Sequence, residues 1–228
     1  MNENDHDDDL SVEGFAERFV PQGRGDAGLY LISPQEVGGA FPDRLRSVLD
    51  GGGVAAFQLR VKGVDQHALA KLAEPLQAIC AEHGTAFIVN DDMSLAKRIG
   101  ADGVHLGQDD GDPREARALL GPQAQIGVTC HDSRHLAMEA GEAGVDYVAF
   151  GAFFPTTTKT VKHVAEPSLL SWWGTLFELP CVAVGGITPE NGGALVQAGA
   201  DFLAVSGAVW NAQDPAAVVA AFQPLLKR

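Results

Sequence analysis

The sequence lacks long hydrophobic runs and has little positive charge, and both absences exclude classes of function. No apolar run approaches the roughly 18 residues that a membrane-spanning helix needs. The first ten residues, MNENDHDDDL, are acidic, whereas a secretory signal or transit peptide would be basic. Only 16 Lys and Arg residues stand against 30 Asp and Glu residues, which gives a net charge of −14. This charge argues against nucleic acid and anionic membranes as partners.

Cysteine is scarce, and two common nucleotide-binding motifs are missing. Cys80, Cys130 and Cys181 are far apart and do not have the spacing of metal ligands. We expect them to be buried thiols of a protein in the reducing cytoplasm. No GxGxxG motif opens a helix after the first predicted strand, and no Walker phosphate-binding loop occurs. These absences disfavour a dinucleotide-binding enzyme and a P-loop NTPase.

Half of the net negative charge lies at the N-terminus. Residues 1–17 contain seven acids and no Lys or Arg, which leaves 23 acids against 16 bases in the rest of the chain. A charged segment with few apolar residues cannot bury enough surface to become ordered. We therefore expect residues 1–20 to form an acidic, disordered tail and residues 21–228 to form one folded domain.

From residue 27 onward, strand patterns alternate with helix patterns. Helical periodicity is clearest at residues 65–84, where leucine and isoleucine recur on one stripe. Eight βα units without a linker predict an α/β fold, a single-domain (β/α)8 TIM barrel. An open doubly wound sheet is the alternative, but it would usually contain fewer strands. The eight predicted strands are residues 28–33, 55–61, 86–91, 103–108, 125–130, 147–152, 181–187 and 202–208.

Carboxylates close two neighbouring predicted strands, with Asp91 after the third strand and Asp110 after the fourth. The carboxyl ends of adjacent parallel strands lie about 4.8 Å apart. Two acidic loop tips side by side form a site for a hard divalent cation, for which magnesium is the best fit. Alternatively, acidic residues cap the helices that follow, a role that suits Asp92 and Asp112. We favour the metal site, because capping does not require two acids in a row at each strand end.

The predicted strand at residues 55–61 carries polar side chains at alternate positions. Gln58, Arg60 and Lys62 share one face, and the apolar residues between them share the other. Since the apolar face must meet the helices, the polar side chains point into the barrel and toward its mouth. Cations there need an anion. This anion is either Asp91 or Asp110 in a structural ion pair, or a bound di- or polyphosphate, which we favour.

Hydroxyl-bearing residues follow the fifth and sixth predicted strands. Thr129 and His131 stand at the end of the fifth, where His131 is either a general base or a hydrogen-bonded spacer. The sequence GAFFPTTTKT follows the sixth, and it contains Thr156, Thr158 and Lys159. Threonine-rich loops are often plain surface. Directly after a barrel strand, this one favours a lid that hydrogen-bonds phosphate oxygens.

The last two predicted strands end in the glycine-rich turns VGGIT and AVSGAV. Gly186 and Gly207 allow a ligand to approach the backbone closely, and Ser206 adds a hydroxyl group. Phosphate binding by the loops after strands 7 and 8 recurs in barrels. His105, flanked by apolar residues within its strand, is interpreted as a satisfied interior residue. Two phosphate-binding regions on one mouth predict a magnesium-dependent enzyme that joins or cleaves phosphorylated small molecules.

Together these motifs resemble the thiamine phosphate synthase family. The matching pieces are QLRVK, IVNDD, GVHLGQDD, IGVTCH, GAFFPTTTK, VGGI and ADFLAVSGAV, in the family's order across residues 55–210. The resemblance implies a transferase of thiamine biosynthesis that couples 4-amino-5-hydroxymethyl-2-methylpyrimidine diphosphate with 4-methyl-5-(2-phosphooxyethyl)thiazole and releases diphosphate. It also implies that residues 21–228 form the catalytic TIM barrel of a cytoplasmic, Mg²⁺-dependent enzyme.

The resemblance further implies roles for individual residues. Magnesium would be held by Asp91 and Asp110. The pyrimidine diphosphate would be bound by Gln58, Arg60, Lys62, Asn90, Thr129 and Lys159, of which Arg60, Lys62, Thr129 and Lys159 would be catalytic. The thiazole phosphate would be bound by Thr156, Thr158, Gly186, Ser206 and Gly207.

The chemistry that the resemblance implies is dissociative. Diphosphate leaves first, helped by magnesium and the cations, and the thiazole nitrogen captures the pyrimidine-methyl cation. Three departures from the family's usual pattern concern substrate affinity: Thr129 replaces a common Ser, GAFF replaces Gly-Pro, and VSGA stands in the last loop. A thiazole tautomerase-like isomerase and a catalytically silent paralogue that senses thiamine-pathway metabolites remain alternatives. The expected partners are phosphorylated small molecules, and the sequence leaves the oligomeric state open, a homo-oligomer included.

Overall fold

The computed structural model describes residues 25–156 and 163–228, and its strands form one closed parallel barrel. The single-domain (β/α)8 barrel is therefore confirmed, and the open doubly wound sheet is wrong. The tail predicted at residues 1–20 lies outside the described residues. The strands pair in chain order, and β8 closes on β1; they are β1 (Gly28–Ile32), β2 (Val54–Leu59), β3 (Ala86–Asn90), β4 (Gly103–Leu106), β5 (Gln125–His131), β6 (Tyr147–Gly151), β7 (Cys181–Val184) and β8 (Phe202–Val205).

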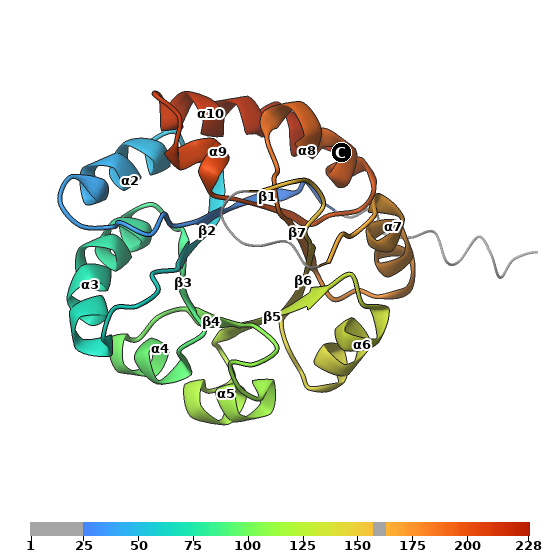
Figure 1. The fold of residues 1–228 in the computed structure, drawn as a ribbon, viewed down its shortest axis with the longest axis horizontal. Coiled ribbons are helices and arrows are strands. Elements are labelled where there is room, and N and C mark those ends of the chain that lie inside the picture. The colour runs from blue at the N-terminus through green and yellow to red at the C-terminus, as the bar shows by residue number, and fades with distance from the viewer. Residues whose placement is uncertain (1–24, 157–162) are drawn as a thin grey trace, which may run out of the picture.

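Helices form a ring around the barrel (Figure 1). The stripe predicted within residues 65–84 packs against the core, since Leu69, Leu76 and Ile79 of α3 are buried. Within the described ranges, no helix is long and apolar enough to cross a membrane. The helices are α2 (Phe41–Leu49), α3 (Gln66–Glu82), α4 (Met93–Ile99), α5 (Pro113–Leu120), α6 (Arg134–Glu142), α7 (Pro167–Leu176), α8 (Pro189–Gln197), α9 (Gly207–Trp210) and α10 (Pro215–Phe222), followed by a 3-10 turn at Gln223–Leu225.

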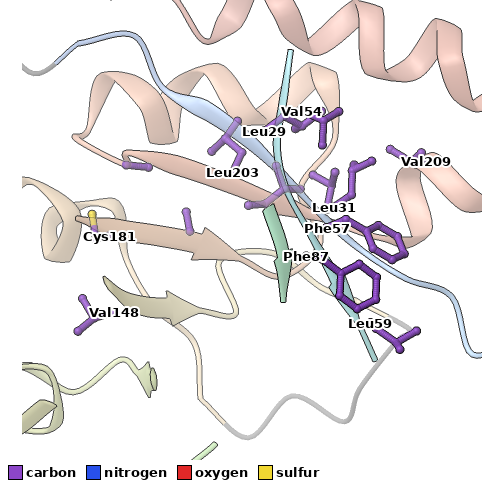
Figure 2. Close-up of a cluster of buried hydrophobic side chains, with 14 of the residues drawn as sticks. Leu29, Leu31, Val54, Phe57, Leu59, Phe87, Val148, Cys181, Leu203 and Val209 are labelled. Carbon is purple, nitrogen blue, oxygen red and sulfur yellow. The ribbon is translucent and has the colours of Figure 1, made fainter. Parts of the chain in front are cut away.

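Two layers of buried side chains fill the molecule, because successive strand residues point to opposite faces of the sheet. The larger layer lies between strands and helices and includes Phe57 and Phe87, which Figure 2 shows beside each other. The smaller layer lies inside the barrel and consists of Tyr30, Ala56, Ile88, Tyr147, Ala149, Val182 and Ala204. A Cβ at Gly127 would lie 2.0 Å from the Tyr147 ring, so glycine at this position makes room for the tyrosine.

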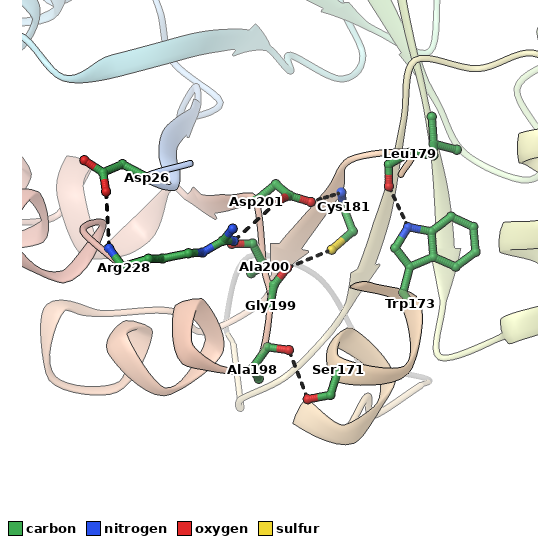
Figure 3. A network of polar contacts seen from close by, with 10 residues as sticks. All are labelled: Asp26, Ser171, Trp173, Leu179, Cys181, Ala198, Gly199, Ala200, Asp201 and Arg228. Carbon is green, nitrogen blue, oxygen red and sulfur yellow. Dashed lines mark hydrogen bonds and ion pairs between the residues drawn. The ribbon is translucent and has the colours of Figure 1, made fainter. Parts of the chain in front are cut away.

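At the amino ends of the strands, three aspartates fix the strand register. Asp102, Asp146 and Asp201 immediately precede β4, β6 and β8. Each carboxylate accepts a hydrogen bond from a backbone N–H at the start of the preceding strand, at 2.6 to 2.9 Å. Arg117 pairs with Asp146 at 2.6 Å. Arg228 pairs with Asp201 at 3.4 Å, as Figure 3 shows. The polar side chains at this end of the barrel are thus used for structure.

Apart from β5, which runs one residue further than predicted, the observed strands are shorter than the predicted ones. One consequence concerns the cations. β2 ends at Leu59, so Arg60 and Lys62 lie in the following loop, and the prediction that they continue the alternation of the strand is wrong. Gln58 does lie in the strand, and it is only 3% exposed. β7 likewise ends at Val184, since the two glycines that follow adopt positive φ angles.

Candidate active site

The carboxyl ends of β2, β3 and β4 bring opposite charges together at the barrel mouth. The ammonium Nζ of Lys62 lies 2.5 Å from Oδ2 of Asp91. Asp91 also shares a side-chain hydrogen bond with Asp110, and the positive charge of Arg60 acts on it. The Lys62 side chain is 55% exposed and that of Asp91 24%. The predicted ion pair therefore exists, but it lies at the open mouth and not in the core.

The two carboxylates differ in their affinity for protons. Burial acts to raise the pKa of Asp91, but the hydrogen bonds with Lys62 and Asp110 outweigh it and leave this pKa below its ordinary value. Burial raises the pKa of Asp110, and the hydrogen bond with Asp91 and its negative charge raise it further. Asp110 therefore holds a proton more tightly than Asp91 does.

Two adjacent carboxylates mark a position where a cation can bind. Asp110 is held there by the backbone N–H of Gly107, which donates to its Oδ2 at 2.9 Å. Among the described residues, no cluster of three or more His, Cys, Asp or Glu side chains could hold a metal. Magnesium does not need such a cluster, because it keeps several waters and often binds one or two carboxylates together with substrate phosphates. Asp91 and Asp110 therefore fit magnesium.

The turn after β3 separates the acid at the mouth from the acid that caps a helix. Asp91 adopts a positive φ of 65°, a conformation that Asp tolerates better than most residues. The next carboxylate, that of Asp92, accepts a hydrogen bond from the N–H of Leu95 at 2.8 Å and caps α4. Asp112 caps α5 in the same way. The capping alternative is thus confirmed for Asp92 and Asp112, but it does not apply to Asp91.

Two residues after β1, which the sequence analysis missed, hold the loop that carries the cations. Ser33 Oγ accepts a hydrogen bond from the N–H of Arg60 at 2.9 Å. The side-chain oxygen of Gln35 accepts a hydrogen bond from the backbone N–H of Lys62 at 3.1 Å, and its Nε2 donates to the backbone carbonyl of Lys62 at 2.6 Å. Their position directly after the first strand, in ISPQ, is the only sequence signal for this role.

A chain of buried polar side chains runs across the inside of the barrel. Gln58 Nε2 donates to the Tyr30 hydroxyl at 3.1 Å, and the hydroxyls of Tyr30 and Tyr147 lie 3.0 Å apart. The Tyr147 hydroxyl lies 3.1 Å from Nδ1 of His105, whose Nε2 lies 2.8 Å from Thr129 Oγ1. The interpretation of His105 as a satisfied interior residue is confirmed. The chain links Gln58 to Thr129, which are both predicted substrate-binding residues.

The remaining predicted residues lie around the rest of the mouth, at the ends of their strands. Asn90 closes β3 and is half-buried. Ser206 lies just before α9, which begins at Gly207, and its side chain makes no capping hydrogen bond. Ser206 Oγ donates to the carbonyl of Ser33 at 3.4 Å, which joins the loops after β8 and β1. Thr156 is half-buried at the end of a described range. The predictions for Thr158 and Lys159 lie outside the described residues.

Gly186 serves the packing of the chain itself. It has a positive φ of 64°, and a Cβ there would lie 2.4 Å from the carbonyl oxygen of Pro155. The loop after β6 therefore rests on the turn after β7. The backbone N–H of Phe154 donates to the carbonyl of Gly185 at 3.0 Å and holds this contact.

His131, for which the sequence left two roles open, stacks on a second histidine. It lies at a bulge of β5 with a positive φ of 54°, and its ring centroid is 4.6 Å from that of His163. His163 Nδ1 lies 3.2 Å from Asp132. His131 therefore packs against the loop that returns to α7, and the sequence gave no signal for this partner.

The fold and the mouth define a class of protein, a (β/α)8-barrel enzyme with its polar residues gathered at the carboxyl ends of the strands. The model of the thiamine monophosphate synthase family matches residues 29–209. The chain belongs to this family.

Relatives with known names agree with this assignment. The chain is 66% identical over 196 residues to the thiamine-phosphate synthase of Erythrobacter litoralis, with 84% of this chain and 92% of that protein covered. It is 54% identical over 204 residues to the thiamine-phosphate synthase of Rhodospirillum centenum, with 89% and 99% covered. Among solved structures, the thiamine phosphate pyrophosphorylase from Pyrococcus furiosus has a TM-score of 0.78 and 28% identity, covering 89% of this chain and 96% of its own.

Proposed function

We propose that this chain is a Mg²⁺-dependent thiamine phosphate synthase of the cytoplasm. It couples 4-amino-5-hydroxymethyl-2-methylpyrimidine diphosphate with 4-methyl-5-(2-phosphooxyethyl)thiazole to give thiamine phosphate and diphosphate. The observation that carries the proposal is the clustering of Lys62, Asp91 and Asp110 at the mouth of a barrel of this family. A tautomerase acting on a thiazole phosphate needs no such cluster, because its substrate has no diphosphate.

The diphosphate leaves from the side of the mouth formed by β2, β3 and β4. Asp91 and Asp110 would hold Mg²⁺, which when bound neutralises charge on the departing diphosphate. The exposed ammonium of Lys62 turns from Asp91 to a phosphate oxygen as the substrate binds. Arg60 supplies a second positive charge from a loop whose backbone Ser33 fixes. The C–O bond breaks with its electron pair going to diphosphate, which leaves a pyrimidine-methyl cation, so these side chains favour the departure by stabilising the negative charge, without a strong base.

The two organic rings meet above the centre of the barrel. Gln58, Asn90 and Thr129 contact the pyrimidine, and the thiazole phosphate lies over the ends of β7 and β8. Gly186 and Ser206 stand at those two ends. Thr156 extends this group from the loop after β6, and Gly207 offers its backbone N–H. In this arrangement the thiazole nitrogen faces the carbon that diphosphate leaves.

One experiment tests the proposal directly. The purified chain is mixed with both substrates and MgCl₂, and thiamine phosphate is measured by its conversion to fluorescent thiochrome. Product should form only when both substrates are present, and it should be lost when EDTA replaces the metal. No product under these conditions would overturn the proposal. Isomerisation of the thiazole phosphate alone would instead identify a tautomerase, and binding without turnover a metabolite sensor.

A further inference from the structure

The proposed function uses only the two ends of the buried polar chain inside the barrel. Gln58 and Thr129 touch substrate in that proposal, whereas Tyr30, Tyr147 and His105 have no assigned role. These three side chains come from β1, β6 and β4, and they are 4%, 7% and 9% exposed. Burying three polar groups in a barrel interior is costly unless each is hydrogen-bonded, and here each one is.

One direction of hydrogen bonding lets both tyrosine hydroxyls and the His105 ring accept once and donate once. Gln58 Nε2 is a donor only, so the Tyr30 hydroxyl accepts from it and gives its own hydrogen to Tyr147. Burial raises the pKa of both phenols, so each keeps its single proton. Tyr147 then donates to Nδ1 of His105, and the ring proton of His105 lies on Nε2, which donates to Thr129 Oγ1. The Thr129 hydroxyl keeps its own hydrogen for a ligand.

At the other end of this hydrogen-bonded series, Gln58 presents an acceptor. Among the described residues, the side-chain amide of Gln58 has a hydrogen-bond partner at Nε2 and none at Oε1. In the part of the chain that the structure describes, no buried side-chain nitrogen or oxygen lacks a partner. The carbonyl oxygen Oε1 of Gln58 is therefore in contact with solvent, where a ligand can reach it. The hydrogen-bonded series of side chains thus has an acceptor at one end, Gln58, and a donor at the other, Thr129.

The geometry points to Tyr30, Tyr147 and His105 as positioning residues for an aminopyrimidine ring. They orient Gln58 so that its Oε1 accepts a hydrogen bond from the ring, and Thr129 so that its hydroxyl donates one. This inference rests on the proposed function for the identity of the ring. An aminopyrimidine offers an N–H donor for Gln58 and a ring-nitrogen acceptor for Thr129. The rings of His105 and Tyr147 stack with centroids 5.6 Å apart, which keeps the middle of the chain rigid.

A direct test needs neither substrate nor activity. Two-bond ¹H–¹⁵N spectra of the ligand-free protein, labelled at histidine, report which ring nitrogen carries the proton, and His105→Gln assigns the signal among the seven histidines. We expect Nε2 of His105 to be protonated and Nδ1 to be bare. Tyr147→Phe removes the hydroxyl that donates to Nδ1 of His105, so the Nδ1 resonance should move to the chemical shift of an unprotonated nitrogen without a hydrogen bond. Tyr30→Phe should move this resonance little. A proton on Nδ1, or an Nδ1 signal that ignores Tyr147→Phe, overturns the inference.

Binding measurements separate positioning from simple loss of packing. Tyr147→Phe should raise the dissociation constant for the pyrimidine diphosphate about three- to tenfold, the effect of one misdirected hydrogen bond. Its affinity for inorganic diphosphate with Mg²⁺ should stay unchanged, because that probe binds at the cations. Equal losses for both probes would indicate a packing defect and refute the positioning role. If the wild type fails to bind the pyrimidine diphosphate, the proposed function fails, whereas the histidine spectra still test the chain.

Discussion

Replacing Asp91 with Asn separates a cation site from a structural ion pair. Asn tolerates the left-handed backbone conformation at this position, as Asp does, so the turn after β3 survives the change. The variant loses the negative charge that Lys62 and a cation would share. We expect turnover to fall by about 10²–10³-fold, the usual effect of removing one group that stabilises charge in a transition state.

The structure indicates that Asp91→Asn lowers the free energy of unfolding only slightly. A buried ion pair that loses one partner costs about 3–5 kcal/mol, because a charge is left without compensation. Here the Lys62 side chain is 55% exposed, so water compensates it. An exposed pair contributes about 0–1 kcal/mol. For a chain of this size, 1 kcal/mol corresponds to about 2–4 °C in melting temperature. Asp91→Asn should therefore melt within a few degrees of the wild type.

The neighbouring acid provides a matched control. Asp92 carries the same charge one residue further on, but it caps α4, and Asn caps a helix about as well as Asp. Thiamine phosphate formation and thermal melting are measured for both variants with and without MgCl₂. Asp92→Asn should keep nearly normal turnover. If Asp91→Asn does so too, or if both variants lose turnover equally, the cation site is not at Asp91.

Three further outcomes follow from charges at the mouth and at the opposite end of the barrel. The affinity for Mg²⁺, measured by calorimetry, should rise with pH through the elevated pKa of Asp110, because the cation displaces its proton. Arg228→Met should lower stability by about 1–3 kcal/mol in urea unfolding, since the arginine binds the Ala200 carbonyl at 2.6 Å as well as an aspartate. The hydrogen bond that Asp50 accepts from His83 raises the pKa of His83 above 6.5. The stabilisation by protonated His83 should therefore be present below pH 6.5 and disappear as the pH rises through the raised pKa of His83. In His83→Gln this dependence of stability on pH should be absent.

The barrel could be predicted because its signal is repeated along the chain. Eight apolar stretches separated by helical patterns leave few alternatives. The meeting of Asp91 with Asp110 was predictable for the same reason, since the carboxyl ends of neighbouring parallel strands must be adjacent. The exact end of a strand carries no such repetition. Arg60 and Lys62 continue the alternation of β2 in the sequence, but the backbone leaves the sheet at Leu59.

The contacts that hold the site could not be predicted, because they depend on side-chain size and on distant strands. Ser33 and Gln35 are ordinary polar residues that meet their partners 27 positions away. Tyr30 and Tyr147 are 117 residues apart and meet only because small side chains leave space inside the barrel. His105 was correctly placed in the interior, but its partners became visible only once the barrel had closed.

The three aspartates before β4, β6 and β8 have a consequence for how the barrel assembles. Each joins an even-numbered strand to the odd-numbered strand before it. This defines three βαβ units, and in each unit the aspartate fixes the register of the two parallel strands. The first pair of strands has a register shift at Leu29 and Tyr30. Its position is set from the other end of the chain, where the Arg228 N–H binds Asp26 and the Leu226 carbonyl receives Ala27. Closure of the ring thus joins the two ends of the chain, whereas the register of the other three strand pairs is supported within each pair.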